Sequence, residues 1–225
     1  MKSTAQLHSK KFVSHLRGVT ETKGYRCFST FNYEAYQNEH RFPFGSLEVV
    51  NDEYLAPLQN INYDFNAQTQ LILIPLVGAF DFKGLNTNGF VHSEQIQLLN
   101  AQKSSSLSIS NPYSENWINY LQLRIKTAEN PQKIDFNYNS KNTLQTIYTS
   151  NEIRITTGFF DSKAETVYRL KEKENGLFAI TLNGAFEIEN RLMENRDALC
   201  VKNSEEIDIE ALTHQSIILL LELKL

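Results

Sequence analysis

One ten-residue pattern occurs twice in this chain and restricts the folds that it can adopt. The segment LIPLVGAFDF, at residues 73–82, matches AITLNGAFEI, at residues 179–188, and both contain an identical Gly-Ala-Phe. The two copies are 106 residues apart. Two later pairs of segments match at a separation of 100 residues: 106–111 with 206–211, and 120–125 with 220–225. A shorter loop in the second half accounts for the change, because loops absorb changes of length at low cost. The sequence therefore predicts two similar halves.

Short strand-like runs recur within each half. Residues 46–50, 71–82 and 120–125 are rich in apolar side chains, and turn residues such as Asn51-Asp52 separate the runs. Aromatic residues make up 11% of the chain, with 10 Tyr and 14 Phe, which favours pleated, half-buried surfaces over long helices. We expect an all-β protein with few short helices. Each half should form a jelly-roll-like β-barrel, because closure removes most of the exposed strand edges.

A polar segment separates the two halves. Residues 126–142 contain Pro131 and several Asn and Lys, without a sustained hydrophobic period, as is typical of a crossing between domains. We predict an N-terminal barrel over residues 1–130 and a C-terminal barrel over residues 131–225. Either length can bury a hydrophobic core without disulfides or metals to support it.

Composition excludes several classes of function. The formal charge of −4 and the scattered Lys and Arg provide no broad positive field, so we expect neither nucleic acid nor a membrane as a direct partner. Cys27 and Cys200 lie far apart without a CxxC motif, which argues against a disulfide framework or a zinc site. The first 16 residues lack an apolar run, and the stretch 217–221 is too short to cross a bilayer. We therefore expect a cytoplasmic protein.

Several segments resemble one known family. FPFGSLEVVNDEYLAPL, at residues 42–58, and its continuation to Gly78 resemble the pirin family of bicupins, including quercetinase-type members. The preceding CFSTFNYEAY (27–36) and the later SNPYSENWINYLQLRI (110–125) are similar to the same family. Residues 196–223 resemble its C-terminal cupin. The resemblance covers most of the chain and implies a bicupin, with two jelly-roll barrels in tandem.

The resemblance also implies a metal site, whose ligands this chain lacks. In the family, two His separated by one residue and a later His-x-Glu hold iron or a similar divalent ion. Counted without gaps, the first two ligand positions fall on Asp64 and Asn66, with Gln70 in place of an acidic neighbour. The last two fall on Leu107 and Ile109. One carboxylate and one amide cannot compete with water for a transition metal. We predict that the metal motif is lost and expect no cofactor; these five residues are the candidate binding positions that remain.

No other residues replace the missing ligands. The corresponding positions of the second half hold Leu170, Glu172 and Gly176. The five histidines, at positions 8, 15, 40, 92 and 214, form no His-x-His pair. His92 stands beside a serine and a glutamate, but adjacent residues of a strand point to opposite faces, so we interpret this group as the start of a surface strand.

The residues near the former ligand positions suggest a dry interior. Tyr63, Phe65 and Phe80 alternate as in a strand and are expected to pack in the core, and Asp64 with Asn66 could equally form a turn. Leu107 and Ile109 would make the former pocket drier and more apolar. We therefore predict a metal-free, non-catalytic module that binds a small hydrophobic molecule or a protein partner. The alternatives are a quercetin 2,3-dioxygenase-like oxidoreductase, as the resemblance implies, and a structural relic with a filled cavity.

Overall fold

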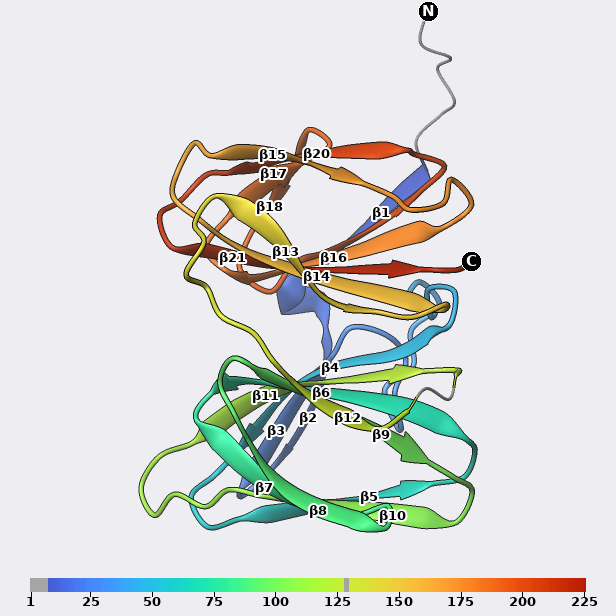
Figure 1. The fold of residues 1–225 in the computed structure, drawn as a ribbon. Coiled ribbons are helices and arrows are strands. Elements are labelled where there is room, and N and C mark those ends of the chain that lie inside the picture. Colours follow the sequence, from blue (N-terminus) through green and yellow to red (C-terminus); the bar gives the residue numbers. More distant parts are fainter. Residues whose placement is uncertain (1–7, 128–129) are drawn as a thin grey trace, which may run out of the picture. The chain divides into compact units, whose positions relative to one another are not determined.

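The computed structural model describes residues 8–127 and 130–225, whose regular structure consists of strands and one short 3-10 helix, η1 (Ser14–Leu16). The chain divides into two compact units (Figure 1). The N-terminal unit is Arg17–Phe136, and the C-terminal unit joins residues 8–16 with Asn137–Leu225. The predicted all-β class is confirmed, because strands account for nearly all the regular structure of the described residues.

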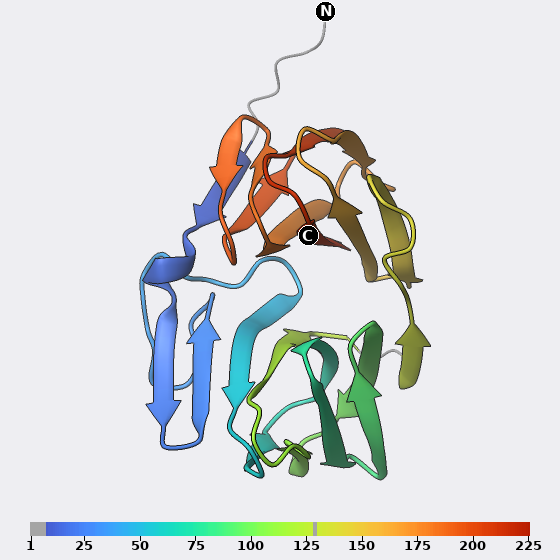
Figure 2. The ribbon, with the colours of Figure 1, turned by 90° about the vertical axis from the view of Figure 1, so that its left-hand side faces the viewer.

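The N-terminal unit consists of two sheets that enclose one core. The larger sheet has the strand order β12-β9-β6-β11-β4-β3-β2 and the smaller one β5-β10-β7-β8. Figure 2 shows the β2–β3 hairpin, in blue, at the edge of the larger sheet. The strands are β2 (Gly18–Thr22), β3 (Tyr25–Ser29), β4 (Leu47–Leu55), β5 (Asn60–Phe65), β6 (Thr69–Val77), β7 (Ala79–Gly84), β8 (Thr87–His92), β9 (Gln95–Ala101), β10 (Ser105–Ser110), β11 (Ile118–Ile125) and β12 (Gln132–Asp135).

The C-terminal unit repeats this plan. Its larger sheet has the order β1-β19-β16-β21-β14-β13, and its smaller sheet the order β15-β20-β17-β18. Strands β14 to β21 therefore correspond one by one to β4 to β11. The strands are β1 (His8–Phe12), β13 (Thr143–Thr149), β14 (Ile153–Phe160), β15 (Glu165–Arg169), β16 (Gly176–Asn183), β17 (Phe186–Ile188), β18 (Arg191–Met193), β19 (Ala198–Lys202), β20 (Glu206–Ala211) and β21 (Ser216–Leu223).

The internal repeat seen in the sequence corresponds to this shared topology. Gly78 and Gly184 both lie at φ +76°, in the left-handed region that favours glycine. A register irregularity precedes each glycine: β6 against β11 skips one residue at Leu76, and β16 against β21 skips one at Leu182. The hairpin β7–β8 is longer than β17–β18, which accounts for most of the fall in the separation of the matching segments from 106 to 100, and the remainder arises between β9 and β10.

Each unit has its own apolar core between its sheets. In the N-terminal unit the core includes Leu71, Leu73 and Phe80, and in the C-terminal unit it includes Phe160 and Phe186, whose rings meet edge to face. Burial of such side chains is the main favourable contribution to folding.

The division between the units differs in two places from the predicted one at 130/131. Strand β1 pairs with β19, so residues 8–16 belong to the C-terminal unit although they precede the N-terminal one. Strand β12 pairs with β9 and extends the N-terminal unit to Phe136. In each case the polar strand covers an otherwise open sheet edge, a long-range pairing that local sequence patterns do not indicate. No helix in residues 8–127 and 130–225 is long and apolar enough to cross a membrane.

Candidate functional site

The candidate site lies on the inner face of the pair β5 and β10, where the resemblance places the family's metal. In the register of this pair, Tyr63 stands opposite Leu107, and Ile61 opposite Ile109. Tyr63, Leu107 and Ile109 are 5%, 1% and 0% exposed and belong to the core cluster, as does Phe65 at 3%. The buried part of the inner face therefore consists of aromatic and aliphatic side chains, among which Tyr63 carries a polar phenol.

Two of the predicted positions lie outside this face. Asp64 and Asn66 are exposed, because their neighbours Tyr63 and Phe65 point inward and side chains alternate along a strand. Strand β5 pairs with β10 without a register shift, so the alternation of inward and outward side chains holds along its whole length. Asp64 and Asn66 are therefore exposed and lie outside the core cluster, whereas Tyr63 and Phe65 pack in the core as expected.

The other three predicted positions are buried, on two different faces. Leu107 and Ile109 point into the core, as the sequence indicates. Gln70 is 0% exposed, but it lies on the opposite face of β6 from Leu71, a core residue. Gln70 is therefore separated from the other candidates by its own strand.

A buried carboxyl, which the sequence reasoning missed, contacts this inner face. Glu53, on β4, is 0% exposed and stands opposite Tyr120 of β11 and Cys27 of β3. The Tyr63 hydroxyl contacts Glu53 Oε2, and the Tyr120 hydroxyl lies 3.0 Å from the same oxygen. The two hydroxyls are 2.6 Å apart. Asn51 Nδ2 donates to Glu53 Oε1 at 3.4 Å. We call Glu53, Tyr63 and Tyr120 the buried triad.

Burial determines the electrostatics of the triad. It raises the pKa of the Glu53 carboxyl, and hydrogen bonds from Tyr63, Tyr25 and Tyr120 offset only part of that rise. Burial also raises the pKa of the Tyr63 and Tyr120 phenols, and the nearby Glu53 carboxylate would raise them further. All three groups therefore favour their neutral forms.

An arginine lies over the aromatic wall beside the triad. The Arg124 guanidinium carbon is 5.0 Å from the centre of the Phe65 ring and 5.9 Å from that of Tyr63, within the range of cation–π attraction. Its Nε donates to Gln122 Oε1 at 2.8 Å, and one terminal nitrogen donates to the Tyr33 hydroxyl at 3.1 Å. Arg124 is thus held by aromatic and neutral oxygen partners, and no salt bridge of the described residues joins it to Glu53.

The C-terminal unit contains a counterpart with a different charge balance. Tyr168 stands opposite Ile207, as Tyr63 stands opposite Leu107, and its hydroxyl donates to Glu222 Oε2 at 2.9 Å. Here Arg154 forms an ion pair with the same carboxylate at 2.5 Å. Lys171 N and Asn175 Nδ2 also donate to Glu222, at 2.7 and 2.6 Å. This carboxylate is therefore compensated by a cation, unlike Glu53.

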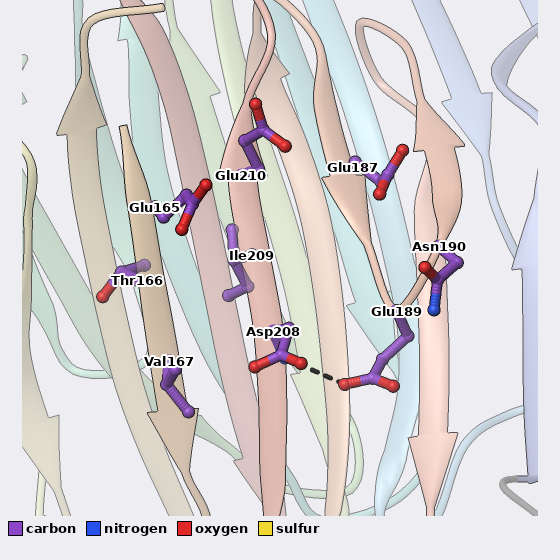
Figure 3. A pocket seen from close by; sticks show the side chains of 9 residues that line it. All are labelled: Glu165, Thr166, Val167, Glu187, Glu189, Asn190, Asp208, Ile209 and Glu210. Carbon is purple, nitrogen blue, oxygen red and sulfur yellow. Dashed lines mark hydrogen bonds between the residues drawn. The ribbon is translucent and has the colours of Figure 1, made fainter. Parts of the chain in front are cut away.

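The outer face of the small C-terminal sheet forms an acidic groove of about 560 Å³ (Figure 3). Glu165, Glu210 and Glu187 stand directly opposite one another on β15, β20 and β17. The Asp208 backbone N–H donates to Glu189 Oε1 at 2.8 Å. No salt bridge of the described residues involves these five acids. The groove therefore presents a negative field that disfavours anionic ligands.

The fit of a transition metal can be judged from the donors. Within the described residues, no three His, Cys, Asp or Glu side chains come together in a way that could hold a metal ion. On the inner face of β5 and β10, the only donors are the Tyr63 phenol and the adjacent Glu53 carboxyl, which already bond each other. Imidazole and carboxylate sets suit such metals, so the residues present do not fit one.

Comparison with known proteins agrees with the topology. Residues 140–223 match the quercetinase C-terminal cupin domain family. No curated protein sequence matches the chain. Among solved structures, the chain is similar to the bacterial pirin YhhW of Escherichia coli in complex with nickel(II), with a TM-score of 0.83, 16% identity, and coverage of 96% of this chain and 99% of that one.

Two further structures share the fold. Quercetin 2,3-dioxygenase from Acinetobacter baumannii has a TM-score of 0.75 and 12% identity, with 97% of this chain and 79% of that chain covered. The protein YhaK from Escherichia coli has a TM-score of 0.73 and 17% identity, with 88% and 94% covered. At these identities the likeness to solved structures establishes the fold alone.

Proposed function

We propose that this chain is a metal-free, non-catalytic binding module built on the fold that it shares with a bacterial pirin, with a C-terminal half that matches the quercetinase C-terminal cupin domain family. The observation that carries the proposal is the inner face of β5 and β10. Tyr63, Phe65, Leu107 and Ile109 are packed there in one hydrophobic cluster. A metal would have to displace core side chains and would find no imidazole to bind.

The same packing disfavours a small molecule inside the N-terminal unit and therefore favours a protein partner. Pockets for small ligands enclose roughly 300–1,000 Å³. Tyr63, Phe65 and Leu107 occupy the corresponding part of the N-terminal unit, and each is at most 5% exposed. A ligand there would require the core to repack, at a cost of several kcal/mol. We therefore propose that binding uses an outer surface and that the packed barrel serves as a rigid scaffold.

Metal content tests the first part of the proposal. We expect protein purified without chelator and then dialysed to contain far less than one iron, nickel, copper, manganese or zinc ion per chain. Elemental analysis measures this directly. One tightly held ion per chain, lost on substitution of Glu53 or Tyr63, would overturn the proposal and show that the buried triad takes part in a metal site.

A flavonol assay tests the competing enzymatic function, which is suggested by the match to the quercetinase C-terminal cupin domain family. Quercetin oxidation with added divalent iron, nickel, copper or manganese should not exceed that of a blank with metal alone, because oxygen chemistry on a flavonol needs a bound metal to bring the reactants together. Protein-dependent turnover that chelator abolishes would favour the dioxygenase-like function.

A further inference from the structure

We infer that Glu53 is a proton-binding site inside the N-terminal unit, where it is held as the neutral acid and closes a ring of three hydrogen bonds with Tyr63 and Tyr120. The inference rests on the geometry of the buried triad and is independent of the proposed function. It concerns a group that is 0% exposed and belongs to no metal site of the described residues.

The number of protons supports this assignment. Three close oxygen contacts connect the triad: Tyr63 to Glu53 Oε2, Tyr120 to the same oxygen at 3.0 Å, and hydroxyl to hydroxyl at 2.6 Å. Each contact at these distances needs one proton, and a phenol carries only one. Two phenols therefore supply two protons for three contacts. The third proton must come from the carboxyl, so that each oxygen donates to one neighbour and accepts from the other.

The surrounding groups provide no positive charge that would hold the carboxylate. Tyr25 and Cys27 face Glu53 from β3, and Asn51 lies beside it on β4. These groups are neutral because burial raises the pKa of both the Tyr25 phenol and the Cys27 thiol. Three further groups lie around this cluster. They are Glu34, whose charge raises the pKa of the Cys27 thiol, together with Tyr33 and Arg124.

The arginine nearest to this cluster is directed elsewhere. Arg124 bonds Gln122 and Tyr33 and stacks over Phe65. The C-terminal unit shows what a buried glutamate with a cation looks like in the same fold, because Glu222 pairs with Arg154 at 2.5 Å. An ionised Glu53 would be a buried charge without a cation, which is strongly unfavourable.

Deprotonation of Glu53 should therefore destabilise the N-terminal unit. The folded-state pKa of Glu53 lies above the ordinary value of 4.5. Its contribution to stability is fully present below that value and is lost as the pH rises through the folded-state pKa. This is the reverse of the usual behaviour of a carboxyl group. The N-terminal unit should therefore be less stable in alkaline than in mildly acidic conditions.

Urea unfolding of the full chain between about pH 5 and about pH 9 tests the inference. Trp117 is the only tryptophan and lies in the N-terminal unit, so its fluorescence reports on that unit. In the parent protein, Glu53 releases one proton on unfolding, so the unfolding equilibrium constant should rise with pH. This rise should be steeper than in Glu53→Gln by a factor of up to about ten per pH unit. The matched control Asp64→Asn removes an exposed carboxyl of the same unit and should keep the parent slope.

Equal slopes for the parent and Glu53→Gln would overturn the inference. If Glu53→Gln does not fold, infrared spectroscopy of the folded parent decides instead. With glutamate labelled by ¹³C at the side-chain carboxyl, a carbonyl stretch of a protonated acid should persist at neutral pH and should shift in Tyr63→Phe. The absence of that band in the labelled parent would show that Glu53 is ionised and would rule out the ring of three protons.

Discussion

Ile109 shows how strongly a single residue of the inner face constrains the N-terminal unit. It is 0% exposed and lies in the core cluster, opposite Ile61 on β5 and Phe82 on β7. Ile109→Glu would remove about 1.5–3 kcal/mol of apolar burial and place an acid among hydrocarbon groups, at a further cost of several kcal/mol. We expect the urea midpoint measured by Trp117 fluorescence to fall sharply or folding to fail.

The adjacent Ser108 provides a matched control for this substitution. It lies on the same strand but is half-buried and points to the other face. Ser108→Glu should change the free energy of unfolding by less than about 1 kcal/mol. Equal losses in Ile109→Glu and Ser108→Glu would contradict the assignment of the inner face.

At the same scale, the sequence predicted some site residues and missed others for identifiable reasons. Leu107 and Ile109 share the inner face of β10, as their spacing predicts, because the strand has no irregularity between them. Asp64 lies on the outer face of β5, opposite the core side chains, because a gap-free count of positions does not determine which face of a strand a residue occupies. Glu53 was missed because Asn51-Asp52 suggested a turn, whereas β4 runs unbroken to Leu55. Tertiary contacts on both faces of the strand override the turn preference of these residues.

Among the strand pairs, the row of Glu165, Glu210 and Glu187 carries an electrostatic cost. Each stands directly opposite the next across neighbouring strands, and like charges in such pairs repel. Glu210→Gln removes the middle charge and both repulsions. We expect it to stabilise the C-terminal unit by about 0.5–1 kcal/mol at low ionic strength, as measured by thermal melts followed by circular dichroism.

Salt dependence and a second variant make this prediction specific. The gain should shrink in about 1 M salt, because screening weakens exposed charge pairs. The control is Glu206→Gln on the same strand, which removes an ion pair with Arg169 at 2.8 Å and should give no stabilisation. A gain of equal size in both variants, or one that salt does not reduce, would show that repulsion within the row is not its cause.

The strands themselves were easier to predict from the sequence than the strands with which they pair. The matching segments around Gly78 and Gly184 fall on equivalent strands, because the same left-handed glycine and the same bulge are needed at this turn in both units. The strands β1 and β12 were not predicted as sheet edges. Both are polar, and their pairing depends on residues far away in the sequence: β1 on β19, and β12 on β9.

For the molecule as a whole, strand β1 is the feature that departs most from two consecutive domains. It pairs along its whole length with β19, and Lys11 forms an ion pair with Asp197 at 2.8 Å. Deletion of residues 1–12 should leave β19 as an exposed edge. We expect its amides, in Ala198–Lys202, to exchange hydrogen faster, because their strand pairing is partly lost. Mass spectrometry of deuterium uptake measures this.

The corresponding strand of the other unit is the internal reference. β9 keeps its partner β12 in the truncated chain, so the amides of Gln95–Ala101 should keep their protection. Unchanged exchange in β19 would mean that β1 contributes little to the C-terminal unit.

The position of β1 also determines the order in which the chain can complete its folding during synthesis. Residues 17–136 are contiguous, so the N-terminal unit has all its strands once the ribosome has passed Phe136. Strand β1 is made before any of them, yet its partner β19 emerges only after the whole N-terminal unit. At a typical rate of about 5–20 residues per second, β1 waits for roughly ten seconds or more without its partner. Strand β1 has the sequence HSKKF, in which Ser9, Lys10 and Lys11 are polar. These polar side chains protect the unpaired strand from premature association with other strands.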